Sequence, residues 1–150
     1  MWKFKEFNRL TTFELFKIYK LRVDTFVVEQ QCAYPEIDDK DLQAIHIFDW
    51  EDDNVLSYAR LIIDDQQLHI GRVIVAQSAR GNGAGRILME KVLSYIKTHH
   101  AHTPMHLQGQ AHLHDFYASY GFKAVSDVYL EDIIPHIDME RPAFKVSNQF

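Results

Sequence analysis

The sequence has only one cysteine, Cys32, among its 150 residues. An internal disulfide is therefore excluded, and such sparse cysteine is typical of a reducing compartment. No segment approaches the roughly 20 apolar residues that a membrane-spanning helix requires. The first segment, MWKFKEFNRL, alternates apolar and charged residues and lacks the apolar run and cleavage site of a secretory signal. These absences predict a cytoplasmic protein that does not insert into a membrane.

An excess of positive charge and internal repeats are also missing. The formal net charge is -5 at pH 7, whereas proteins that bind nucleic acid usually present a strongly basic face. Nucleic acid is therefore not an expected partner. The hydrophobic content of 47% and the charged content of 25% are ordinary for a folded chain of this length. We predict a single domain spanning residues 1–150.

Hydrophobic periodicity predicts the elements of the N-terminal half. Residues 2–7 alternate like a half-buried strand, and Thr11 and Glu14 can form a capping box that begins a helix ending near Val27 or Val28. An irregular acidic loop follows over residues 29–40. Three strands joined by short acidic connections are predicted at residues 44–50, 55–63 and 68–75, and they suggest an antiparallel meander.

The C-terminal half opens on a glycine-rich turn, Ser78 to Gly85, followed by apolar residues at helical spacing. The turn predicts the start of an amphipathic helix. Beyond it we expect a strand at residues 105–111, a short helix at 112–120 that Gly121 ends, and closing strands at 122–130 and 136–140.

The glycine-rich turn has the chemistry of an anion site. Helix N-termini carry unpaired N–H groups and partial positive charge, so small residues there let a phosphate approach the backbone. The letters RGNGAG match neither a Walker A loop nor the dinucleotide fingerprint in register. Taken alone, the turn leaves open a role in packing.

Two motifs give the chain a family resemblance. Arg80-x-x-Gly83-x-Gly85 after the strand IGRVIV resembles the acetyl-CoA motif of the GCN5-related N-acetyltransferase (GNAT) family. The segment from Phe116 to Phe122, FYASYGF, resembles that family's F-Y-x-x-x-G-F segment.

Further letters are similar to the ElaA-like branch over roughly residues 19 to 141: LR, FVVEQ, IGRV, QAHL and EDIIPH, with Cys32, Tyr34, Glu36, Asp38, Asp41 and His46. Two departures stand out. Ile133 replaces an expected glycine before Pro135, and Gln110 replaces an asparagine common in the wider family.

The resemblance implies an α/β (α+β) fold of the GNAT acyl-CoA N-acyltransferase type. Its mixed, mostly antiparallel central sheet would be flanked by helices, with the fourth and fifth strands splayed apart. It also implies direct transfer of an acetyl group from acetyl-CoA, as co-substrate, to an amine. The residues then expected to bind acetyl-CoA are Ile74 and Val75 through their main chain, Arg80, Gly81, Asn82, Gly83, Ala84, Gly85, Arg86 and Gln110.

Tyr117 is the predicted general acid, since the resemblance places a tyrosine there to protonate the departing CoA thiolate. A phenol of pKa about 10 is protonated at neutral pH, although the same residue could be a packed aromatic beside Phe116. The acceptor must also lose a proton. Candidate bases or relays are Glu29, Glu36, Asp38, Glu131, His46 and His136. Glu131 and His136 rank first because EDIIPH follows the Tyr117 helix.

The acidic loop and the histidines each allow two interpretations. Residues predicted to bind the acceptor are Glu29, Glu36, Asp38 and His46, although a solvated acidic loop would have the same letters. No metal site is predicted from the histidine groups at residues 99–102 and 112–114. Cys32 has no feature of a thiolate nucleophile and is expected to be a small buried residue.

Two other functions stay open at this point. One is a non-catalytic acyl-CoA-binding or sensing module, and the other is an interaction domain in which RGNGAG only packs. An exposed strand edge could also pair two subunits into a homodimer, and no residue pattern decides this.

Overall fold

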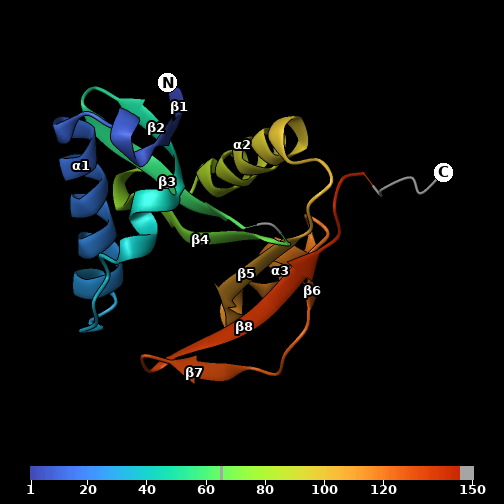
Figure 1. Ribbon diagram of the computed structural model, residues 1–150. Coiled ribbons are helices and arrows are strands. Elements are labelled where there is room, and N and C mark those ends of the chain that lie inside the picture. The colour runs from blue at the N-terminus through green and yellow to red at the C-terminus, as the bar shows by residue number, and fades with distance from the viewer. Residues whose placement is uncertain (65, 146–150) are drawn as a thin grey trace.

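The computed structural model describes residues 1–64 and 66–145, and within them eight strands form one sheet in the order β1-β2-β3-β4-β5-β8-β6, with β7 paired to β8 (Figure 1). The paired neighbours are antiparallel except β4 and β5, which are parallel. The strands are β1 (Trp2–Glu6), β2 (Ile45–Glu51), β3 (Asn54–Ile63), β4 (Leu68–Val75), β5 (Met105–Gln110), β6 (Lys123–Ala124), β7 (Tyr129–Glu131) and β8 (Ile134–Arg141). The predicted meander is confirmed as β2-β3-β4.

The first helix, α1 (Thr12–Val23), begins as predicted. The Glu14 N–H donates to Thr11 Oγ1 over 3.0 Å, and the Thr11 N–H donates to Glu14 Oε1 over 2.9 Å. The helix continues into a π-helical turn, Asp24–Glu29. The other α-helices of the described residues are α2 (Ala84–His99) and α3 (His114–Ala118), and single 3-10 turns occur at Phe7–Arg9, Asp39–Gln43, Gln77–Ala79 and Ala111–Leu113.

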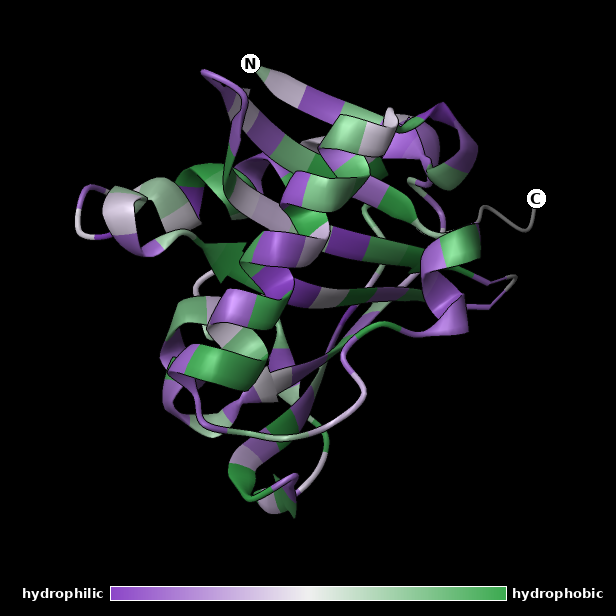
Figure 2. Cartoon of the chain, turned by 90° about the vertical axis from the view of Figure 1, so that its left-hand side faces the viewer, coloured by the Kyte–Doolittle hydropathy of each residue, from purple (hydrophilic) through white to green (hydrophobic). Residues whose placement is uncertain are grey.

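Helices cover both faces of the sheet. Neighbouring residues of β3 point to opposite faces and so pack against different helices. Tyr58 faces the α1 side and packs in a cluster with Ile18. Ala59 faces the α2 side and packs in a larger cluster with Leu88 and Val92. Figure 2 shows hydrophobic and hydrophilic residues interleaved along the helices. Among the helices that the structure describes, none is both long and apolar enough to cross a membrane.

The parallel strands β4 and β5 separate along their length. They pair only where Leu68–Ile70 lies beside Met105–Leu107, and beyond these residues they diverge (Figure 1). β4 is bent at this point, since its register with β3 shifts between Tyr58 and Arg60 and Arg72 has a φ of 51°. The predicted splay of the fourth and fifth strands is therefore confirmed, and it opens the centre of the sheet.

The prediction of one closing strand over residues 122–130 is wrong. The structure has two short strands, β6 and β7, separated by residues 125–128. Ser126 Oγ accepts the Asp138 N–H over 3.0 Å. Because this side chain takes the place of a main-chain acceptor, it interrupts the ladder along β8. Local alternation in the sequence does not reveal such a substitution.

The turn between β7 and β8 has two residues, Asp132 and Ile133, with φ values of 48° and 66°. Two-residue hairpins of this kind favour glycine or asparagine, and a β-branched residue with positive φ is strained. Ile133 is also 77% exposed, so it has little packing to offset the strain.

We expect Ile133→Gly to raise the free energy of unfolding by about 0.5–1 kcal/mol. Relief of about 1–2 kcal/mol of strain should exceed the cost of glycine's freedom in the unfolded chain. Urea denaturation measures the change. Ile133→Ala is the control, because it removes the exposed side chain but keeps a Cβ at positive φ. Equal stability of the two variants would contradict the strain argument.

Candidate active site

The RGNGAG loop ends at the N-terminus of α2 and leaves backbone donors unpaired. Gly81 and Gly83 have φ values of 92° and 82°, and a Cβ built at either would meet nothing within 4 Å. The first helical bond runs from the Ile87 N–H to the Gly83 carbonyl over 3.2 Å. The N–H groups of residues 84–86 therefore have no helical acceptor. They border a pocket of about 240 Å³ that is open to an anion.

Arg80 connects this loop to two other segments. Its Nε donates to the Val75 carbonyl over 2.9 Å, and its Nη1 lies 3.0 Å from Glu29 Oε2. Glu29 therefore contacts the RGNGAG loop through Arg80 and is absent from the lining of the cleft of about 680 Å³ described below. Arg86 and Asn82 are exposed at the same loop.

The end of β4 offers one free edge. The Ala76 N–H donates to the Leu56 carbonyl on β3. In an antiparallel ladder every second residue directs its main-chain N–H and C=O to the same neighbouring strand, so those of Ile74 also face β3. The main chain of Val75 points the other way, into the gap beside β5. Of the two residues predicted to bind the CoA arm through main-chain groups, Val75 is the one whose N–H faces this gap.

Helix α3 joins the two sequence motifs in space. A Cβ built on Gly85 of the glycine-rich loop would lie 3.7 Å from the Phe116 ring, which shares the pocket lining with Val75. Beside it, the Tyr117 ring lies so close to β5 that a Cβ on Gly109 would approach it within 2.9 Å. Gly85 and Phe116, 31 residues apart in sequence, thus meet where β4 and β5 diverge.

Tyr117 is 4% exposed. Burial raises the pKa of its phenol to about 12. No hydrogen bond of the hydroxyl to another group is present in the part of the chain that the structure describes. The group therefore keeps its proton at neutral pH and has it available for a bound molecule.

A second, larger cleft of about 680 Å³ opens on the α1 side of the splay. It is enclosed by the loop before β2, the middle of the sheet and the end of β7. Cys32 Sγ donates to the Asp132 carbonyl over 3.1 Å and so joins this loop to the β7–β8 turn. As predicted, Cys32 is buried. Asp38 and Glu131 line this cleft, whereas Gln110 and His136 face each other in register on β5 and β8.

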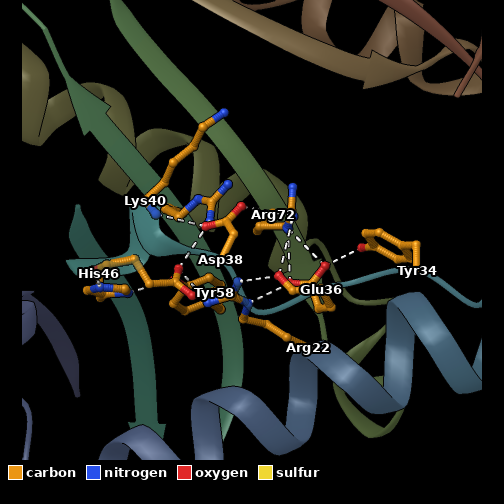
Figure 3. A network of polar contacts seen from close by, with 10 residues as sticks. Arg22, Tyr34, Glu36, Asp38, Lys40, His46, Tyr58 and Arg72 are labelled. Carbon is orange, nitrogen blue, oxygen red and sulfur yellow. Dashed lines mark hydrogen bonds and ion pairs between the residues drawn. The ribbon is translucent and has the colours of Figure 1, made fainter. Parts of the chain in front are cut away.

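One wall of the cleft is a network of buried charges (Figure 3). Arg22, with no exposed surface, donates to Glu36 over 2.7 Å and to Asp41 over 2.8 Å. Arg60 lies 2.7 Å from Asp38 and 3.1 Å from Asp41. Glu36 is thus a buried partner of arginine and is absent from the lining of the cleft.

The network extends from β4 to the loop. Arg72 Nε lies 2.9 Å from the Glu36 carboxylate, and the Tyr34 hydroxyl donates to the same group. Ion pairs with the arginines balance the negative charge of these acids, so the acidic loop does not form a free anionic pocket. The sequence suggested either a pocket for a cationic amine or a solvated loop, whereas in the structure these acids are paired with arginines.

His46 is fully buried behind this wall. Its Nδ1 lies 2.7 Å from the Tyr58 hydroxyl and its Nε2 lies 2.9 Å from the Asp41 carbonyl. Burial lowers its pKa, which keeps the ring neutral. The structure therefore places His46 among the residues that hold the wall, and it is absent from the lining of the cleft.

The predicted bases lie on the β7–β8 side. Glu131 is exposed at the cleft, and none of the described residues forms an ion pair with its carboxylate. His136 Nδ1 donates to the Ile134 carbonyl over 2.7 Å, which leaves Nε2 as the basic atom. In residues 1–64 and 66–145, no three His, Cys, Asp or Glu side chains are arranged to hold a metal ion.

Sequence reasoning missed several residues of the cleft. His69 and His106 pair across β4 and β5 with their Nδ1 atoms 3.2 Å apart, and His69 Nε2 lies 3.0 Å from Asp64. Lys40, Arg60 and Arg72 also line the cleft. Only a strand register could have revealed the histidine pair, because 37 residues separate its members.

Comparisons with known proteins agree with this geometry. Residues 16–142 match the acetyltransferase (GNAT) domain. The chain is 42% identical to protein ElaA of Escherichia coli strain K12 over 145 residues, or 93% of this chain and 95% of that protein. The crystal structure of an acyl-CoA N-acyltransferase from Pseudomonas aeruginosa has a TM-score of 0.90 with 43% identity, over 94% of this chain and 99% of that one.

A more distant structure shares the fold alone. An aminoglycoside 6'-N-acetyltransferase complexed with coenzyme A has a TM-score of 0.70 and 14% identity, over 97% of this chain and 99% of that one. The domain match over residues 16–142 and the identity to ElaA along most of the chain show that this protein is an acyltransferase of the GNAT family, in the branch that contains ElaA.

Proposed function

We propose that the chain is a single-domain N-acetyltransferase that transfers an acetyl group directly from acetyl-CoA to the amine of a small molecule or peptide. The observation that carries this proposal is the meeting of the glycine-rich loop and α3, through Gly85 and Phe116, where β4 and β5 diverge. The loop supplies unpaired N–H groups, and α3 supplies a protonated phenol beside the same opening.

The residues present fit acetyl-CoA. The N–H groups from Gly81 to Arg86 would hold its pyrophosphate, with Arg80 and Arg86 adding positive charge. The Val75 N–H would pair with the pantetheine arm in the gap, and the Gln110 amide lies at the end of β5 on its other side. The acyl thioester supplies the acetyl group when it is bound.

Tyr117 is the proposed general acid. As the amine nitrogen bonds to the thioester carbonyl carbon, the carbon–sulfur bond breaks and the phenol donates its proton to the thiolate. The raised pKa of Tyr117 keeps that proton in place until the thiolate forms.

The attacking amine must be neutral, and deprotonation at pH 7 costs roughly 4–5 kcal/mol for an amine of pKa about 10.4. Glu131, which lines the acceptor cleft, is the foremost proposed base or first member of a water relay. His136 is the second, through its free Nε2. Asp38 belongs to the cleft wall that faces the acceptor.

Gly83→Asp should weaken acetyl-CoA binding by about 10- to 100-fold in calorimetry, because a carboxylate would lie against the pyrophosphate. Gly83→Asn is the matched control, since it has the same shape and also tolerates positive φ but carries no charge. It should bind more tightly than the aspartate variant.

No binding of acetyl-CoA to the unmodified protein would contradict the proposal. Binding without transfer to any amine in a broad panel would favour the second candidate, a non-catalytic acyl-CoA-binding or sensing module. Retention of a protonated tyrosine at the splay argues against that candidate.

A further inference from the structure

The buried network of the cleft wall is balanced in charge. Three arginines, Arg22, Arg60 and Arg72, face three acids, Glu36, Asp38 and Asp41, at distances of 2.7–3.6 Å. Lys40 is therefore an additional positive charge on this wall. Its main-chain N–H donates to Asp38, but within the described residues its Nζ has no hydrogen-bond or ion-pair partner.

Donors of Arg72 are also unused. Its Nε and Nη2 contact Glu36 and Asp38, while none of the described residues accepts a hydrogen bond from its Nη1. The side chain is 24% exposed and lines the cleft. Figure 3 shows the ends of Lys40 and Arg72 pointing to the same side of Asp38. The wall thus presents an ammonium and a guanidinium edge to a ligand in the cleft.

The acids near this wall cannot satisfy these donors. Asp38 is already held by two arginines. Asp64 accepts the N–H groups of Gln66 and Gln67 over 2.8 and 2.9 Å, and its other oxygen faces His69. The carboxylates of the cleft without an ion-pair partner among the described residues belong to Glu131 and Asp132, at the end of β7 and the following turn.

The cleft therefore has unpaired cationic donors on its loop and β4 wall and unpaired carboxylates on its β7 wall. A small zwitterion complements both: its carboxylate accepts from Lys40 and Arg72, and its ammonium faces Glu131. A volume of about 680 Å³ suits such a molecule and is within the range of small-molecule sites. A simple cationic amine would leave the donors unpaired.

We propose that the acceptor is a free amino acid, whose carboxylate Lys40 and Arg72 bind while its amine is presented to the acetyl donor. This inference rests on the proposed acetyltransferase function. It adds the requirement for a carboxylate on the same molecule as the amine and assigns Lys40 and Arg72 to its recognition.

The test compares amines that differ only in the carboxylate. Release of CoA thiol from acetyl-CoA is followed with the twenty amino acids and with decarboxylated partners: cadaverine for lysine, phenethylamine for phenylalanine and isopentylamine for leucine. At least one amino acid should be acetylated with a kcat/KM about 10-fold or more above that of its partner, the effect of one charge-assisted hydrogen bond.

Lys40→Gln should raise the KM for that amino acid about 10-fold with little change in kcat, and Lys40→Arg should restore it. For the decarboxylated partner, which has no carboxylate for Lys40 to bind, Lys40→Gln should not raise the KM. Lys97→Gln, at an exposed position near the end of α2, is the matched control.

Equal or better turnover of the decarboxylated amines would overturn the inference while the acetyltransferase function stands. It would also be overturned if the acetyl-CoA complex neither acetylated nor bound any of the twenty amino acids in calorimetry. Calorimetry of acetyl-CoA alone separates these outcomes from failure of the proposed function, because that binding does not involve the acceptor cleft.

Discussion

Tyr117→Phe is expected to lower kcat by about 10²- to 10⁴-fold, the usual contribution of a positioned general acid. The substitution removes one hydroxyl and keeps the ring that packs against Gly109, so folding should be retained. Affinity for acetyl-CoA should stay near that of the unmodified protein, since the loop at the N-terminus of α2 is unchanged. Steady-state kinetics with an acceptor found in the amine panel and calorimetry with acetyl-CoA give the two values.

Tyr95→Phe on α2 is the matched control, because it removes a phenol that stacks on Phe4 rather than one at the splay. Its kcat should equal that of the unmodified protein. The pH profile gives an independent readout. With the pKa of Tyr117 raised to about 12 by burial, the acid form persists through pH 10, so its ionisation should cause no fall in kcat there. An unchanged kcat in Tyr117→Phe would assign this residue to packing alone.

Arg22→Met is expected to lower the free energy of unfolding by about 3–5 kcal/mol. Methionine fills similar space but leaves the three acids of the network with two arginines. One negative charge close to Glu36 and Asp41, which are 3% and 1% exposed, is then uncompensated. That loss is a large part of the 5–15 kcal/mol typical of a domain. Urea denaturation monitored by circular dichroism measures it.

The control for this variant is Lys20→Met, two residues earlier on α1. Lys20 pairs with Asp24 over 3.0 Å, but both side chains are 56% exposed. Solvent screens such a pair, so the change should be under about 0.5 kcal/mol. A loss below about 1 kcal/mol for Arg22→Met would show that the buried network contributes little to stability.

Local sequence patterns predicted those elements that depend on residues close together in the chain. The capping box at Thr11 and Glu14 needs only side chains three residues apart, and it is present as expected. The meander of β2, β3 and β4 follows from alternation and short connections. The resemblance to the GNAT family rests on the glycine-rich turn and the FYASYGF segment, and the domain match confirms this family.

The role of Arg22 was beyond local patterns. Its position on the helix indicates only a stem that can lie along apolar neighbours and does not show where the guanidinium lies. The structure buries the guanidinium completely against Glu36 and Asp41, 14 and 19 residues away. The sequence does not show which arginines contact the acids of residues 29–41, so their ion pairs could not be predicted from it.

By itself, the sequence determined the family, the loop at the N-terminus of α2 and the position of Tyr117, because each depends on residues close together in the chain. Only the tertiary structure decided which face of the splay each candidate reaches. It joined Glu29 to the RGNGAG loop through Arg80, buried His46 behind the wall, and left the Lys40 ammonium and Arg72 Nη1 in the cleft without a partner among the described residues. The physical reason is that ion pairing and strand register join residues tens of positions apart, and these contacts decide which charges remain free.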